Sequence, residues 1–262
     1  VIVFGSELAE VDIWRADLGH RVEMIRVDID VEVLGDGQKA GEVLQMDANA
    51  LIKTLADMTS PGQVDWTAEE VTQARAKWRS EVEAEYGSIP QIADSLRDCL
   101  PPDTMIYSDM TQFAYVANET FPMDRGGHWH HPSGFGTLGY ALPAAIGGKV
   151  GVGDQPVVSI NGDSGFQYNV QELATAVELG LSLPIIVWDN GKLKEIEDSM
   201  TAAQIAPNAV IARNPEFLRL AEAYGAHAVA PRSIAAFQQA VTAALSADGP
   251  TLIHITPETA QA

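Results

Sequence analysis

The sequence predicts an α/β protein whose main domain is a doubly wound parallel sheet with helices on both faces. Part of another α/β domain precedes it. From about residue 88 onward, short strands rich in Val and Ile alternate with amphipathic helices. The strands are continuously apolar, which is typical of a parallel sheet buried on both faces. A chain of 262 residues, 46% of them hydrophobic, is long enough to bury such a core.

Residues 1–58 have the pattern of a smaller, Rossmann-like α/β unit. Residues 1–4 form a short apolar strand, residues 21–30 alternate and then turn acidic, and residues 42–58 give a short strand followed by a helix. This pattern indicates the C-terminal half of a domain. Because the chain also lacks an initiator Met, we expect it to be a piece of a longer polypeptide.

Residues 59–87 predict a linker followed by a helix. The segment "TSPGQVDW", residues 59–66, has the composition of a linker. Thr67 followed by Glu70 forms a capping box, the usual start of a helix. Apolar residues then recur at helical spacing until Gly87.

Residues 88–262 contain the elements of the main domain. Strands are predicted at 105–109, 156–161, 183–190 and 251–255. Helices are predicted at 90–99, 139–150, 166–179, 214–224 and 233–247.

Composition narrows the classes of partner and compartment. The net charge of -20, from 36 acidic and 16 basic residues, disfavours nucleic acid and anionic membranes as partners. The single Cys99 cannot form an internal disulfide, so we expect a reducing, cytoplasmic setting. No apolar run is long enough for a membrane-spanning helix, and the first residues lack the features of a signal peptide.

Polar side chains follow two successive strands of the main domain. Asp163 comes after the strand "VVSIN", and Asn190 comes after "PIIVW". If the strands are neighbours, these side chains present hard oxygen donors at one edge of the sheet, which suit magnesium or calcium. Gly165 is predicted to open a helix, along the stripe Phe166, Val170, Leu173, Ala174 and Val177, whose free N–H groups could bind an anion. Together these features indicate a metal–diphosphate ligand, although each residue alone could belong to an ordinary turn or helix cap.

This stretch resembles the thiamine-diphosphate motif, in which Gly-Asp-Gly is followed some 30 residues later by Asn-Asn. The resemblance implies that Asp163 and Asn190 supply side-chain metal ligands and that Lys192 supplies its backbone carbonyl. Ser164 replaces the second Gly of the motif and Asp189 replaces its first Asn, but neither position normally ligates the metal.

Residues 133–151, "SGFGTLGYALPAAIGGKVG", resemble the segment that holds the two rings of the same cofactor. The resemblance implies that Leu138 lies between the rings, while the Gly136 carbonyl and the Leu138 N–H bond to the pyrimidine. The simpler alternative is a glycine-rich loop that packs a helix on the sheet.

Residues 107–122 resemble the first strand and loop of the diphosphate-binding domain in enzymes of the acetolactate synthase type. The most similar group is the 2-oxo acid decarboxylases that act on arginine-derived keto acids. The resemblance places Asp109, Thr111 and Gln112 near the diphosphate or the substrate. The full set of implied cofactor-binding residues is Asp109, Gln112, Gly136, Thr137, Leu138, Gly162, Asp163, Ser164, Gly165, Asn190, Lys192 and Leu193.

The resemblance implies the C-terminal portion of an enzyme that uses thiamine diphosphate and Mg²⁺ to decarboxylate or ligate 2-oxo acids. The activating glutamate of such enzymes lies on a pyrimidine-binding domain, usually from another subunit, and no segment here resembles that domain. A homodimer or homotetramer is therefore expected, and no catalytic side chain is assigned to this chain. The alternative is a non-catalytic α/β module for phosphate or nucleotide, which would not need Leu138 and its glycines.

Other polar residues have simple interpretations. The loop with His128, His130 and His131 could hold zinc, lie beside the cofactor or be ordinary surface, and zinc is the least favoured of the three. Glu195 and Glu197 could assist proton transfer, as an acidic residue near this position does in related decarboxylases, and Lys192 and Lys194 could bind the diphosphate. Solvated positions are the favoured expectation for all four, with a helical position for Glu172 and a core position for Trp188.

Overall fold

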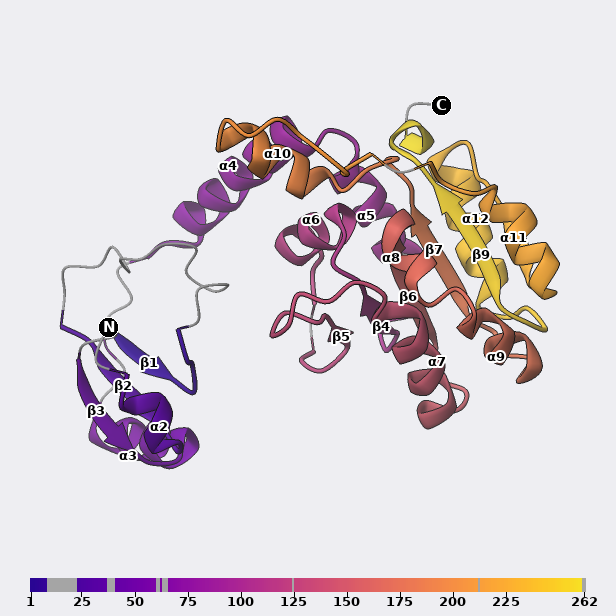
Figure 1. The fold of residues 1–262 in the computed structure, drawn as a ribbon. Helices are drawn as coiled ribbons and strands as arrows, with labels where there is room; N and C mark the ends of the chain where they lie inside the picture. Colours follow the sequence, from indigo (N-terminus) through magenta and orange to yellow (C-terminus); the bar gives the residue numbers. More distant parts are fainter. Residues whose placement is uncertain are drawn as a thin grey trace. The chain divides into compact units, whose positions relative to one another are not determined.

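The computed structural model describes residues 1–8, 23–36, 41–59, 62, 66–123, 125–211 and 213–260. They form two compact units, Val1–Val71 and Thr72–Ala262 (Figure 1). In the first unit, β1 (Ile2–Phe4), β2 (Ile25–Asp28) and β3 (Glu42–Gln45) make a parallel sheet in the order β1-β2-β3. The helices α2 (Val31–Leu34) and α3 (Ala48–Met58) accompany it. The elements predicted within residues 1–58 are therefore confirmed where the chain is described.

The second unit is built on six parallel strands in the order β5-β4-β6-β7-β9-β8. The strands are β4 (Met105–Ser108), β5 (Trp129–His130), β6 (Val157–Gly162), β7 (Pro184–Trp188), β8 (His227–Val229) and β9 (Thr251–Ile255). The helices are α4 (Ala68–Tyr86), which begins in the first unit, α5 (Ile89–Cys99), α6 (Gln112–Thr120), α7 (Ala141–Val152), α8 (Asp163–Tyr168), α9 (Glu172–Glu178), α10 (Lys194–Ala202), α11 (Phe217–Tyr224) and α12 (Ile234–Ala244). A 3₁₀ turn, Pro257–Ala260, follows β9.

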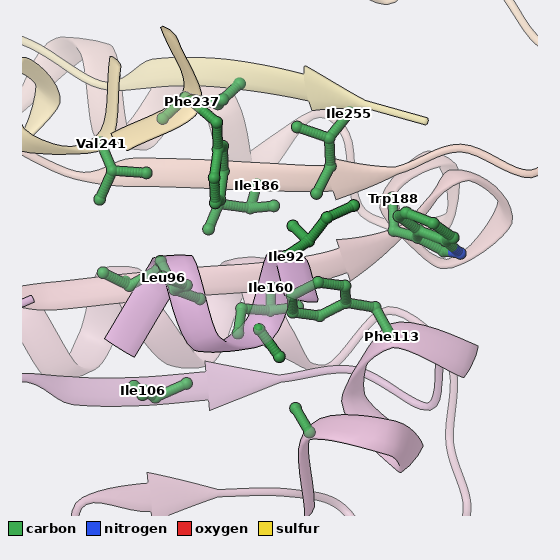
Figure 2. Packing of buried hydrophobic residues seen from close by; sticks show 14 of the residues in the cluster. Ile92, Leu96, Ile106, Phe113, Ile160, Ile186, Trp188, Phe237, Val241 and Ile255 are labelled. Atoms are coloured by element: carbon green, nitrogen blue, oxygen red, sulfur yellow. The ribbon is translucent and has the colours of Figure 1, made fainter. Parts of the chain in front are cut away.

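Two apolar clusters cover the two faces of this sheet. Along β7, Ile186 and Trp188 belong to the cluster with α5, α6 and α12, whereas Ile185 and Val187 belong to the cluster with α7, α9 and α11. Figure 2 shows the first cluster, in which strand residues such as Ile160, Ile186 and Ile255 pack with side chains of those helices. The predicted doubly wound sheet is therefore confirmed, and Trp188 is a core residue as predicted.

The capping box predicted at the start of α4 is present. The Glu70 N–H donates to Thr67 Oγ1 over 3.1 Å, and the Thr67 N–H donates to the Glu70 carboxylate over 2.7 Å. Among the described residues, no helix is long and apolar enough to cross a membrane.

The helix predicted from 166 to 179 was wrong in its bounds. It begins earlier, at Asp163 with Gly162 as N-cap, and is interrupted after Tyr168. At the interruption the Asn169 side chain donates to the Gly139 carbonyl over 2.6 Å, which ties this turn to another loop. In α9 the buried residues are Leu173 and Ala176, while Ala174 of the predicted stripe is exposed.

Apart from the 3₁₀ turn after β9, four described elements of the second unit were not predicted: α6, α10, β5 and β8. The two strands have only two and three residues and lie at the sheet edges, so they carry no readable alternation. The segment around α6 was interpreted as a strand and loop, although Phe113 and Val116 of this helix are buried in the core.

Candidate functional site

The candidate site lies at the carboxyl ends of neighbouring parallel strands. Gly162, the last residue of β6, pairs with Trp188, the last residue of β7. Asp163 and Asn190 therefore follow adjacent strands at the same edge of the sheet, as predicted. Asp109 follows β4, which borders β6 on its other side. This is the edge at which open parallel sheets bind ligands.

Asp163 is buried at this edge, with 3% of its surface exposed. Its Oδ1 accepts the Ser164 N–H over 2.8 Å, and its Oδ2 accepts the Asn214 amide over 2.6 Å. Burial raises the pKa of Asp163 above its usual value, and the neighbouring Asp189 adds to the rise, whereas these two hydrogen bonds oppose it. Within the described part of the chain, every hydrogen-bond donor to this carboxylate is a neutral group.

Asn214 was missed by the sequence analysis, which took it as the start of a helix. Its Nδ2 donates to Asp163 Oδ2 over 2.6 Å and to Asp189 Oδ1 over 2.8 Å. Its Oδ1 accepts from Gln167 Nε2 over 3.2 Å. Asn214 lies 51 residues from Asp163 and 25 from Asp189 in the chain, so no local pattern joins them.

Asp189, which replaces the first Asn of the motif, is held by a histidine and by neutral N–H donors. Its Oδ2 lies 2.9 Å from His254 Nε2 on β9, and its Oδ1 accepts the Gly191 N–H over 3.0 Å. Burial raises the pKa of Asp189, but the contacts with His254 and the hydrogen bonds from Asn214 and Gly191 together outweigh it and leave the pKa below its usual value. The carboxylate added at this position is therefore matched by a histidine from the next strand.

The structure brings Asn190 and Gln112 together, two residues that the resemblance assigned separately to the metal and to the cofactor or substrate. Asn190 Nδ2 donates to Gln112 Oε1 over 3.2 Å, and Asn190 Oδ1 accepts the Lys192 N–H over 3.2 Å. The Leu193 N–H donates to the Val210 carbonyl over 2.8 Å, which fixes the following turn.

The Lys192, Lys194, Glu195 and Glu197 side chains, which were expected to be solvated, are in fact partly buried. Lys192 Nζ lies 2.8 Å from Glu197 Oε2, and Lys194 pairs with Asp198. Glu195 is half-buried, and burial raises its pKa, with the nearby Asp198 adding to the rise. The expectation of an ordinary solvated glutamate is therefore wrong for residue 195, because its side chain is half-buried.

Asp109 is fully buried, and its carboxylate is engaged by backbone. Oδ2 accepts the Gly139 N–H over 2.9 Å, and Oδ1 accepts the Tyr140 N–H over 3.2 Å. Burial raises the pKa of Asp109, and these two bonds oppose the rise. The contact fixes the end of the 133–140 loop against β4.

Gly162 and Gly165 leave room for the side chains of Thr111 and Asp109. A Cβ atom on residue 165 would lie 2.1 Å from Asp109 Oδ2, and one on residue 162 would lie 3.0 Å from Thr111 Oγ1. Ser164, between them, is half-buried and donates its N–H to Asp163. Gly162 and Gly165 therefore allow β4 and its loop to approach α8 closely.

The 133–140 loop presents Leu138 at the same edge. Leu138 is half-buried, between Gly136 with φ of +59° and Gly139 with φ of +85°. Thr137 is exposed, and its hydroxyl donates to the Leu138 carbonyl over 3.2 Å. Both glycines adopt a left-handed backbone that a larger residue would strain.

The three histidines make separate contacts. His128 Nδ1 lies 3.1 Å from the Gly126 carbonyl, His130 stacks on Tyr107, and His131 Nδ1 lies 2.9 Å from Ser108 Oγ. In the described residues, no three His, Cys, Asp or Glu side chains are grouped as metal ligands.

Comparison with known families gives one match over most of the second unit. The family described as "Thiamine pyrophosphate enzyme, C-terminal TPP binding domain" matches residues 109–255. This range contains Asp109, Leu138, Asp163 and Asn190.

Curated relatives agree over nearly the whole chain. A protein of Pseudomonas aeruginosa named probable 2-ketoarginine decarboxylase is 35% identical over 260 residues, which cover 97% of this chain and 46% of that protein. The large subunit of acetolactate synthase isozyme 2 of Escherichia coli is 31% identical and is matched over 88% of this chain and 42% of its own length. The chain thus spans about half the length of these relatives.

Solved structures show the same fold. A thiamine diphosphate-dependent 4-hydroxybenzoylformate decarboxylase of Rhodococcus jostii superposes with a TM-score of 0.72 at 21% identity, over 92% of this chain and 45% of that one. A benzoylformate decarboxylase of Polynucleobacter necessarius gives a TM-score of 0.71 at 17% identity, over 100% of this chain and 49% of that one. From the motif, the fold and these matches, the chain belongs to the thiamine pyrophosphate enzyme family, among the relatives of the 2-oxo acid decarboxylases and acetolactate synthases.

Proposed function

We propose that this chain provides the diphosphate- and metal-binding half of an enzyme that uses thiamine diphosphate and Mg²⁺ to act on 2-oxo acids. The observation that carries the proposal is the buried carboxylate of Asp163, which follows β6 directly beside the strand that precedes Asn190. When bound, the cofactor supplies an electron sink for the carbon that loses or gains a bond.

The residues present fit a magnesium ion. The Asp163 carboxylate, the Asn190 amide oxygen and the Lys192 carbonyl are hard oxygen donors, which Mg²⁺ prefers. Asp163 is buried, and its hydrogen-bond donors among the described residues are neutral. Burying this charge costs free energy, and the pKa of Asp163 is raised for that reason. A bound divalent cation would offset the cost.

The residues present also fit the cofactor rings. Leu138 offers an apolar side chain at the same edge of the sheet, and Gly136 and Gly139 let the backbone approach a ligand closely. In our proposal Leu138 supports the cofactor by packing, and the Gly136 carbonyl and Leu138 N–H bond to the pyrimidine. The other residues that we place around the cofactor in this proposal are Thr137, Ser164, Gly165, Lys192 and Leu193.

The substrate class is a 2-oxo acid, and a cationic one is our first choice. The relative named 2-ketoarginine decarboxylase is similar over 97% of this chain. Acidic side chains also lie near the start of α10, where burial and then the charges of Asp198 and Glu85 raise the pKa of Glu195, while the charge of Lys194 opposes the rise. Such a group would favour a guanidinium over a neutral side chain. Both decarboxylation and carboligation are compatible with these residues.

The rest of the active site would come from another domain. In our proposal a glutamate of a pyrimidine-binding domain from a second subunit activates the cofactor, so the working protein is a homodimer or homotetramer in the cytoplasm. Catalysis then needs more than this half of the protein.

The test uses the full protein that contains this chain. Thiamine diphosphate with Mg²⁺ should raise its melting temperature, whereas ADP with Mg²⁺ should not. Loaded protein should release carbon dioxide from 5-guanidino-2-oxopentanoate faster than from pyruvate. Stabilisation by ADP alone would instead favour the phosphate- or nucleotide-binding module.

A further inference from the structure

We propose that Asn214 is a positioning residue for the metal site, because its amide holds the carboxylates of Asp163 and Asp189 in fixed orientation. The inference rests on the proposed function, since it concerns how this chain prepares Asp163 for a divalent cation. Sequence pattern and family resemblance did not point to Asn214.

The hydrogen bonds use the whole amide group. Each carboxylate receives one N–H from Nδ2, over 2.6 Å at Asp163 and 2.8 Å at Asp189. Gln167 Nε2 donates to the carbonyl oxygen over 3.2 Å. Rotating the amide by half a turn would place its oxygen against two carboxylates, so this orientation is the one that the charges allow.

The Asn214 amide donates to both Asp163 and Asp189 and thereby reduces the repulsion between the two carboxylates. Asp163 and Asp189 follow adjacent strands, and two carboxylates this close repel each other when no group lies between them. Asp189 stands where the family motif has a neutral Asn, so this chain carries one carboxylate more than the motif requires. His254 contacts the far oxygen of Asp189, and Asn214 contacts the near one.

A neutral bridge keeps Asp163 available to a cation. A Lys or Arg at this position would compete with the metal for the carboxylate, whereas an amide orients the oxygens without adding positive charge. Partners that orient a metal ligand in this way typically contribute about 10–100-fold to metal affinity.

The first experiment measures the affinity of the full protein for Mn²⁺, as a probe for the metal, by calorimetry at saturating thiamine diphosphate. Asn214→Ala should bind Mn²⁺ about 10–100-fold more weakly than the parent. Asn208→Ala, an exposed position six residues earlier, is the matched control and should bind as the parent does. Gln167→Met, which removes the donor to Asn214 Oδ1 and to the Asp163 backbone carbonyl at an exposed position, should show a smaller loss in the same direction.

The second experiment needs no metal. Asn214→Ala should lower the melting temperature of the metal-free protein, and the loss should be smaller in the Asp189→Asn background, which has one carboxylate fewer. An equal loss in both backgrounds would show that Asn214 is structural only, and would overturn the inference.

Different results would contradict the proposed function and the positioning role of Asn214. A parent protein that bound no Mn²⁺ with thiamine diphosphate would overturn the proposed function and this inference with it. A parent that bound Mn²⁺ no more tightly than Asn214→Ala would overturn the inference alone.

Discussion

The carboxylate of Asp109 fills the space in which a side chain on residue 165 would lie. A Cβ atom on Gly165 would be 2.1 Å from Asp109 Oδ2, and the same oxygen accepts the Gly139 N–H over 2.9 Å. One buried carboxylate thus joins the end of β4, the start of α8 and the loop that carries Leu138.

This contact predicts a large effect of one methyl group. Gly165→Ala should lower the free energy of unfolding by about 1–3 kcal/mol, because the added atom forces Asp109 away from the backbone groups that it binds. Gly147→Ala is the matched control in α7, where a Cβ would meet nothing within 4 Å. It should be stabilising by about 0.5–1 kcal/mol, the usual gain for a helical glycine. Chemical denaturation of the full protein measures both, and equal effects would contradict the role given to Asp109.

Leu138 is expected to act by packing alone. Leu138→Met should keep most of the affinity for thiamine diphosphate, because bulk and apolarity are preserved. Leu138→Asp should lose it, because a carboxylate would have to be buried against the cofactor. Calorimetric titration with thiamine diphosphate and Mg²⁺ gives the comparison. Normal binding by a folded Leu138→Asp variant would place this residue outside the site.

Stability should fall in mild acid through His131. Burial lowers the pKa of His131 from its ordinary value of 6.5, and its Nδ1 lies 2.9 Å from Ser108 Oγ. Below pH 6.5 the unfolded chain binds a proton that the folded protein does not, so the free energy of unfolding drops as the pH falls toward the folded-state pKa. His131→Gln should show a smaller drop between pH 7.5 and 5.5 in denaturation experiments. An unchanged pH dependence would mean that His131 is not buried as a neutral ring.

The sequence was most informative for features that depend on neighbouring residues or on the pattern within one strand. Apolar runs predicted the central strands, and the oxygen donors after two of them, Asp163 and Asn190, lie at the same edge because parallel neighbours end together. The capping box at Thr67 depends on residues three apart and was equally readable.

Features that depend on contacts between residues far apart in the chain could not be predicted from the sequence. Asn214 reaches Asp163 across 51 residues, and the break after Tyr168 depends on Asn169 bonding to Gly139. Glu195 was expected to be solvated, whereas it is half-buried and its pKa is raised by burial and by charges that include Glu85, 110 residues earlier in the chain. The short edge strands carry too few residues to reveal a period.

The central claim is that Asp163 binds the metal that anchors thiamine diphosphate, and calorimetric titration of the full protein with cofactor and Mg²⁺ tests it most directly. Asp163→Ala should weaken binding by more than about 100-fold, the upper range for residues that only orient a ligand. Asp154→Ala removes an exposed carboxylate nine positions earlier in the chain and should bind as the parent does. A folded Asp163→Ala variant with the cofactor affinity of the parent would contradict the assignment of the site.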